Sequence, residues 1–162
     1  MAVEIKVPIS PGELVDKITI LEIKSARMTD PAKLANVRTE LEMLQDTWKA
    51  SAYASHDIAS QWAALRAINE KLWDIEDDIR DLERARTFDR QFIQLARAVY
   101  VTNDERAAVK RDINTRLGSK IVKCAERRVT FLTTRAGQSP THASESSTPV
   151  VFAKGVHRHR LA

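Results

Sequence analysis

The sequence predicts a mainly α-helical domain: an antiparallel helical hairpin, a long third helix and two shorter helices, with a short N-terminal β-strand. Helix-start signals stand at Ser10 and Asp30. The 162 residues include only four glycines, fewer than a β-rich fold with many tight turns uses. A seam of apolar residues at intervals of three and four, typical of a helix packed lengthwise as in a coiled coil, comprises Leu65, Ile68, Leu72, Ile75, Ile79 and Leu82.

The net charge of +4 comes from one end of the chain. Residues 1–124 contain 20 basic and 20 acidic side chains, whereas residues 125–162 contain 6 and 2. Between residues 136 and 149 the chain is mostly Ser, Thr, Pro, Gly and Ala, a composition typical of disorder. We therefore expect a helical domain over 1–124, a low-complexity, disordered basic tail over 125–162, and no specific nucleic-acid binding.

Cysteine content and hydropathy exclude several classes of site. The single cysteine, Cys124, rules out an intramolecular disulfide and a cysteine-based metal cluster. We expect no cofactor and no metal site. The N-terminus lacks a signal-peptide pattern, and no apolar run approaches the ~20 residues that cross a bilayer. A cytoplasmic protein without a membrane span is expected.

The N-terminal residues alternate between apolar and polar. Val3, Ile5, Val7 and Ile9 would form one buried face of a short strand, and Pro8 favours an edge position. Its candidate partners are residues 120–123 and 129–132, and the pairing stays open.

The predicted hairpin follows. Ser10, Pro11 and Glu13 form a helix start with a capping box, and the helix should run to about Thr29. Its apolar residues lie on two faces, so we expect cover on both, inside a bundle or at a dimer contact. Asp30 caps the second helix. One apolar face of the first helix consists of Leu14, Ile18, Leu21 and Met28, and the other consists of Ile20 and Ile23. The second helix has apolar residues at intervals of three and four, namely Leu34, Val37, Leu41, Leu44 and Trp48.

The third helix, capped by Ser55 or Asp57, should reach about Arg86 and add Ile58 and Trp62 to the seam. A break at residues 87–89 precedes a fourth helix that ends near Val101. A second capping box at 102–105 would open a fifth helix, which Gly118 ends.

Three groups of side chains are candidate sites. Glu22 and Arg38 lie at mirror positions of the hairpin, within or beside its apolar faces, which predicts a shielded ion pair. The pair either fixes the register of the hairpin or surrounds an anionic ligand.

A polar stripe flanks the seam of the third helix. Asn69, Trp73, Glu76 and Arg80 are spaced four, three and four, and could line a polar cleft. The alternative is a helix flank with Glu76 and Arg80 as an i,i+4 pair. The remaining acidic residues, Asp74, Asp77, Asp78 and Asp81, are interpreted as the solvated face.

The predicted fifth helix begins with polar and basic residues. Asn103, Arg106 and Lys110 could form an anion site with the free N–H groups of a helix start. A capped, solvated helix is the alternative. No histidine pairs with a nucleophile in the sequence, and no glycine-rich phosphate loop is present.

Three stretches carry a resemblance to a known family: EIKVPISPGELVDKITILEIKSARMTDPAKLANVRTELE, LWDIEDDIR and FIQLARAVYVTNDERAAVKRDINTRLGSKIV. Over residues 4 to about 122 the chain resembles a family of small bacterial proteins known as a domain of unknown function. Its members occur beside glycosyltransferases of surface-polysaccharide loci. The Ser/Thr-rich tail departs from the family's usual end.

A second resemblance, over the predicted first helix, is to the helical chorismate mutases. The basic residue that those enzymes carry at the head of this helix has no counterpart around residues 11–14, so no catalytic residue carries over.

The leading hypothesis is a non-enzymatic helical interaction or scaffold module that binds a protein partner or a second copy of itself, through the first or third helix. The alternative is an enzyme or binding protein for a small anionic metabolite, linked to surface-polysaccharide biosynthesis. A third hypothesis is that the basic tail binds polyanions. The interior cleft of the alternative would use Glu22, Arg38, Asn69, Glu76 and Arg80.

Overall fold

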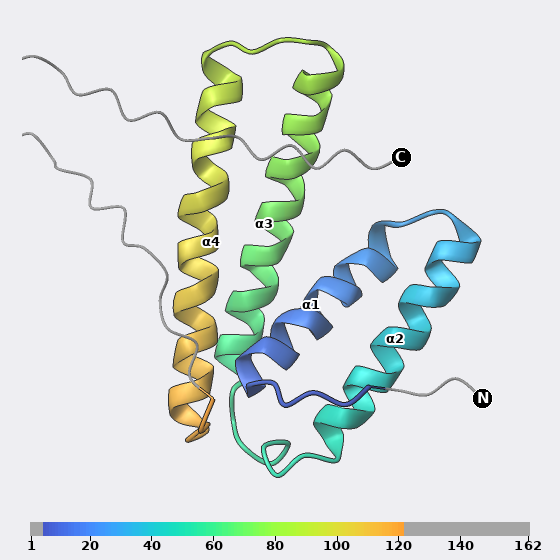
Figure 1. Ribbon diagram of the computed structural model, residues 1–162, viewed down its shortest axis with the longest axis vertical. Coiled ribbons are helices and arrows are strands. Elements are labelled where there is room, and N and C mark those ends of the chain that lie inside the picture. Colours follow the sequence, from blue (N-terminus) through green and yellow to red (C-terminus); the bar gives the residue numbers. More distant parts are fainter. Residues whose placement is uncertain (1–4, 122–162) are drawn as a thin grey trace, which may run out of the picture. The chain divides into compact units, whose positions relative to one another are not determined.

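The computed structural model describes residues 5–121, and these residues form two helical hairpins (Figure 1). Residues 1–4 and 122–162 lie outside the description, including the predicted tail. The mainly α-helical class is confirmed. The helices are α1 (Pro11–Arg27), α2 (Pro31–Lys49), α3 (Ala59–Arg84) and α4 (Arg90–Arg116).

Helix α1 is the central element, because it packs against each of the other three helices. Its start follows the predicted signal: Pro11 occupies the first turn, and the Ser10 hydroxyl accepts a hydrogen bond from the backbone N–H of Glu13 at 3.3 Å. Ile18 is fully buried on one face and Ile23 is 3 % exposed on the other. The prediction that both faces are covered is confirmed, and the cover comes from within the chain.

Helix α2 packs along α1, and it meets α3 through the contact of Trp48 with Trp62. The Asp30 carboxylate caps it by accepting from the backbone N–H groups of Ala32 and Lys33. Its apolar seam, from Leu34 to Trp48, is half-buried throughout, since an outer helix has a neighbour on one side only.

Burial along the seam of α3 decreases toward the C-terminal end of the helix. Leu65 is fully buried and Ile75 is 8 % exposed, whereas Ile79 and Leu82 are only half-buried. Asp57 serves the helix start, because its carboxylate accepts from the N–H of Ala59 at 3.1 Å. The helix ends at Arg84, two residues before the predicted position.

Helix α4 corrects the prediction of separate fourth and fifth helices. It is continuous from Arg90 to Arg116, and Thr102 is buried in its interior with 1 % exposure. A capping box gives only a local preference for a helix start. The packing of α4 along α3 outweighs this preference, so the helix continues through residues 102–105. The predicted end is confirmed: Gly118 adopts φ +60° directly after the C-cap Leu117.

The apolar core lies where α1, α3 and α4 meet, near the base of the α3–α4 hairpin. Trp48 of α2 and Trp62 of α3 extend it through an edge-to-face contact with ring centroids 5.5 Å apart. Residues 5–9 form no strand, and Val3 and both predicted partner segments lie wholly or partly outside the described residues. The central cluster comprises Val15, Ile58, Leu65, Ile113 and Leu117.

Candidate functional site

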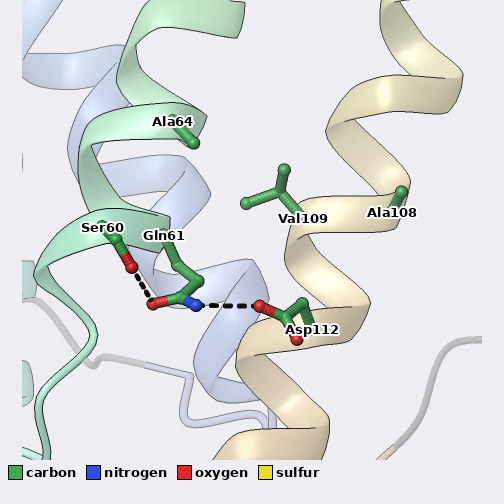
Figure 2. Close-up of a pocket in the computed structure, with 6 residues that line it drawn as sticks. All are labelled: Ser60, Gln61, Ala64, Ala108, Val109 and Asp112. Carbon is green, nitrogen blue, oxygen red and sulfur yellow. Dashed lines mark hydrogen bonds between the residues drawn. The ribbon is translucent and has the colours of Figure 1, made fainter.

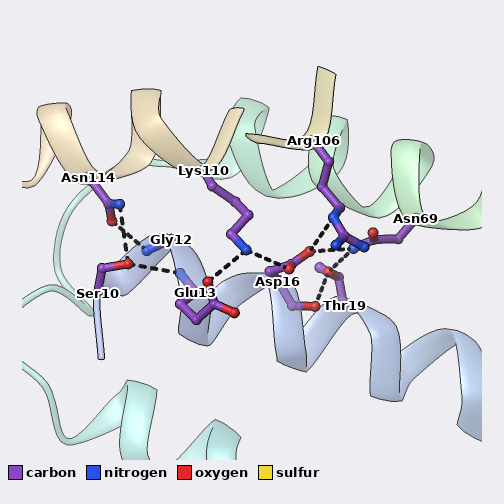
Figure 3. A network of polar contacts seen from close by, with 9 residues as sticks. All are labelled: Ser10, Gly12, Glu13, Asp16, Thr19, Asn69, Arg106, Lys110 and Asn114. Carbon is purple, nitrogen blue, oxygen red and sulfur yellow. Dashed lines mark hydrogen bonds and ion pairs between the residues drawn. The ribbon is translucent and has the colours of Figure 1, made fainter. Parts of the chain in front are cut away.

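A cluster of polar side chains joins α1 to α3 and α4 (Figure 3). It combines buried amides and hydroxyls with two carboxylates and two cations, the chemistry from which a binding site could be built. We call it the interior cluster. Its members are Ser10, Gly12, Glu13, Asp16, Thr19, Asn69, Arg106, Lys110 and Asn114.

Asp16 stands at the centre of the interior cluster, with 3 % of the residue exposed. Its carboxylate accepts from the Lys110 ammonium at 2.9 Å and from the Asn69 amide nitrogen at 3.0 Å. The Arg106 Nε lies 3.9 Å from the same carboxylate. A buried carboxylate needs such partners, because it has lost its hydration.

Lys110 links two carboxylates of α1. Its Nζ lies 2.7 Å from Glu13 and 2.9 Å from Asp16, and its side chain is only 13 % exposed. Together with Arg106, the two cations offset the two carboxylates, so the interior cluster is electrically balanced. No uncompensated charge remains in it to attract an ionic ligand.

At the start of α1, the interior cluster includes a close approach of α1 to α4. The Gly12 N–H donates to the Asn114 side-chain oxygen at 2.8 Å, and the Asn114 amide donates to the Ser10 hydroxyl at 3.2 Å. A Cβ at Gly12 would overlap the backbone carbonyl oxygen of Lys110. The absence of a side chain at this position is therefore what permits the contact.

Asn69 supplies the link to α3. Its amide nitrogen donates to Asp16 and, at 3.0 Å, to the Thr19 hydroxyl, which itself donates to the Asp16 carbonyl. The Asn69 carbonyl oxygen and the Thr102 hydroxyl are the buried side-chain atoms left without a hydrogen-bond partner in the described part of the chain. The interior cluster has the geometry of a clamp between three helices.

The predicted pair of Glu22 and Arg38 is wrong. Glu22 instead faces α3, where its carboxylate lies 3.5 Å from the Arg66 guanidinium. Arg38 is exposed on the outer helix. Mirror positions in a hairpin do not determine which face of each helix turns inward, and here α1 turns Glu22 toward α3.

The predicted stripe on α3 is divided between the interior and the surface. Asn69 belongs to the interior cluster, and Trp73 is half-buried. Glu76 and Arg80 are exposed and form the i,i+4 pair at 2.8 Å. The alternative interpretation, a helix flank with a surface pair, is confirmed for these two residues.

The predicted anion site at residues 103–110 takes a different form. Asn103 is half-buried inside a continuous helix, where backbone N–H groups are already bonded within the helix. Arg106 and Lys110 do approach an anion, but that anion is the carboxylate of Asp16.

A hollow of about 330 Å³ lies between α3 and α4, apart from all these residues (Figure 2). Gln61 donates to the Asp112 carboxylate at 2.9 Å, and Arg116 contacts the same oxygen at 3.0 Å. The pKa of Asp112 is lowered most by the hydrogen bond from Gln61 and next by the hydrogen bond from Arg116. Asp112 therefore stays ionised near neutral pH and is unsuited to act as a general acid. The lining residues are Ser60, Gln61, Ala64, Ala108, Val109 and Asp112.

Sequence reasoning missed Gly12, Asp16, Thr19 and Asn114. One signal was available: Gly12, Asp16, Thr19 and Ile23 are spaced four, three and four, and thus share a face of α1. Asn114 gave no comparable signal, because its role depends on the close approach of α1 to α4.

The distal part of the α3–α4 hairpin, residues 76–101, is a second candidate, which we call the arm. None of these residues is buried, although many are large and apolar. Phe88, Ile93 and Val101 are 57 %, 56 % and 41 % exposed. The large apolar residues of the arm that are half-buried are Ile79, Leu82, Phe92, Leu95 and Val99.

Comparison with known proteins gives one match. The model of a family of unknown function, DUF6165, matches residues 5–148. No curated protein and no solved structure matches the chain. Within residues 5–121, no helix has the length and apolar character to cross a membrane, and no group of three or more His, Cys, Asp or Glu side chains could hold a metal ion.

Proposed function

We propose that this chain, which belongs to the family of unknown function DUF6165, is a non-enzymatic helical interaction module that self-associates through the arm. The observation that carries this proposal is the exposure of large apolar side chains over one continuous element, the arm. Phe88 and Ile93 remain more than half exposed although they belong to an ordered hairpin. Grouped apolar surface of this kind typically marks an interaction site.

The apolar surface of α4 within the arm is wider than one neighbouring helix requires. Phe92, Leu95 and Val99 follow one stripe at intervals of three and four, and Ile93 lies 100° further round the helix. Helix α3 can cover only part of this arc. A further layer of helices would cover the rest, as in a four-helix bundle.

Other exposed apolar residues lack such an arrangement. Ile5, Val7 and Ile9 are exposed on a segment without helix or strand, and Met43 and Ile121 are isolated. Single exposed apolar side chains are common on protein surfaces and carry little information. The arm is therefore the docking surface that we assign.

The arrangement of polar groups favours this proposal over the metabolite-binding alternative. The predicted ligand residues are dispersed: Asn69 is part of the interior cluster, Glu22 faces Arg66, and Arg38 is exposed. A cytoplasmic location and a link to surface-polysaccharide biosynthesis accompany the proposal as expectations.

Light scattering or sedimentation of the full chain over a range of concentrations tests the proposal. Completing the burial of a half-exposed Ile93 contributes about 1 kcal/mol, and a two-fold dimer buries it twice. Ile93→Glu should therefore weaken association by about tenfold or more. Met43→Glu, at a residue 48 % exposed on α2, is the matched control and should leave association unchanged. A wild-type chain that stays monomeric, or equal effects of both variants, would contradict the proposal.

A further inference from the structure

We infer that a second copy of this chain docks on the arm with the acidic α3 of each copy alongside the basic α4 of the other. The inference rests on the proposed self-association and adds the order of the helices in the assembly. Two observations carry it: the separation of charge within the arm, and the charged groups there that form no ion pair within residues 5–121.

The two sides of the arm carry opposite charge. Residues 76–84, the end of α3, contain five acidic residues and two arginines, a net charge of −3. Residues 85–101, the turn and the part of α4 within the arm, contain three arginines and one aspartate, a net charge of +2. The α3 side of the arm is therefore acidic, and the turn and α4 side is basic.

Part of this charge is already compensated within α3. Arg80 pairs with Glu76 and Asp77, and Arg84 pairs with Asp81. The exposed side chains of Asp78 and Glu83 form no ion pair within residues 5–121, and the same holds for Arg86 and Arg90. Unpaired carboxylates therefore remain on α3, and unpaired guanidinium groups remain at the turn and the start of α4.

A two-fold dimer makes each contact twice, so this surface must complement itself. If α3 met α3 and α4 met α4, like charges would face each other along both seams. If α3 meets α4 of the second copy, the charges alternate around the bundle and both seams join opposite signs. Charge at the border of an apolar seam selects partner and orientation in helical bundles in this way.

Among the described residues, the arm keeps exposed side chains that such a partner could contact. The last ion pair between α1 and α3 joins Arg27 to Asp74, just before the arm begins. The part of α4 within the arm runs from Arg90 to Val101, about 18 Å at 1.5 Å per residue. An interface of this length is at the small end for specific complexes, so we expect a dissociation constant of about micromolar order.

Two complementary charge-reversed chains test the order of the helices. Asp78→Lys with Glu83→Lys changes the net charge of residues 76–84 from −3 to +1, and Arg86→Glu with Arg90→Glu changes that of residues 85–101 from +2 to −2. Each variant alone should dimerise about tenfold or more weakly than wild type, while an equimolar mixture should form a heterodimer within about threefold of wild-type affinity. Reversal of the exposed Asp46–Lys49 pair on α2 is the matched control and should have no effect.

Sedimentation velocity with one labelled chain measures these affinities, and circular dichroism checks that each variant is folded. Rising salt should weaken the wild-type dimer. Failure of the mixture to form a heterodimer, dimerisation of the reversed variants at wild-type strength, or an equal effect of the control would overturn the inferred order. If Ile93→Glu still disrupts the dimer in that case, self-association through the arm stands and only the order of the helices is wrong.

Discussion

Replacing Asp16 by alanine is the most direct test of the interior cluster as a structural clamp. The carboxylate is 4 % exposed and holds Lys110, whose side chain is 13 % exposed. Removal of one partner of a buried ion pair costs about 3–5 kcal/mol, because the other charge stays buried without its partner. In the variant, Lys110 would still pair with Glu13 at 2.7 Å, and the Asn69 amide would still donate to the Thr19 hydroxyl. We therefore expect the free energy of unfolding to fall by about 2–4 kcal/mol.

Urea denaturation of the full chain, followed by circular dichroism, measures this loss. Asp46→Ala is the matched control, because Asp46 lies 3.0 Å from Lys49 in a pair that is 64–70 % exposed. Its loss should stay below about 0.5 kcal/mol, since water already screens an exposed pair. In a double-mutant cycle with Lys110→Met, the two substitutions should be coupled by at least about 1 kcal/mol. Equal losses for Asp16→Ala and Asp46→Ala, or strict additivity in the cycle, would show that the interior cluster does not act as a clamp.

Three further outcomes are expected. Gly12→Ala should lower the free energy of unfolding by about 1–3 kcal/mol, because its Cβ would press on the α4 backbone; a stability unchanged in urea would contradict this. Gly118→Ala should lower the free energy of unfolding by about 1 kcal/mol, because a side chain is strained at a φ of +60° although no atom lies within 4 Å of the added Cβ. Calorimetry measures this loss, and a much larger loss would contradict the absence of a steric clash. Gln61→Leu should raise the pKa of Asp112 toward its ordinary value, as a carboxylate NMR titration can measure. Because the folded-state pKa is lowered, the contribution of Asp112 to stability is present above its unfolded pKa of about 3.9 and is lost as pH falls through the folded pKa. The variant should thus lose less stability than wild type below about pH 4, and an unchanged Asp112 titration would refute the role of Gln61.

Local signals in the sequence predicted local structure well. Ser10 and Asp30 cap their helices as predicted, and Gly118 lies just beyond the end of the last one. Each depends on a side chain and the backbone within a few residues of it. The capping box at residues 102–105 shows the limit of such signals, because packing along α3 outweighs it and α4 continues.

The candidate sites were predicted less well, since a site depends on which helix faces which. Residue spacing places Asn69 beside the seam, but its partners Asp16 and Thr19 lie 53 and 50 residues away in the sequence. Lys110 was assigned to an anion site, and the anion it meets belongs to α1. Residue spacing gives the direction of a side chain around its own helix and contains no information about the crossing of two helices.

The sequence by itself determined the helical class, most of the helix starts and the residues that form each apolar face, because periodicity and capping act within a few turns. Only the tertiary structure decided that α1 is central, that Asp16 rather than Glu22 carries the buried ion pair to α4, and that the seam of α3 loses its cover beyond Ile75. These outcomes follow from the lengths and crossing of the helices, because the α3–α4 hairpin extends beyond α1 (Figure 1). Apolar side chains of the arm therefore stay exposed.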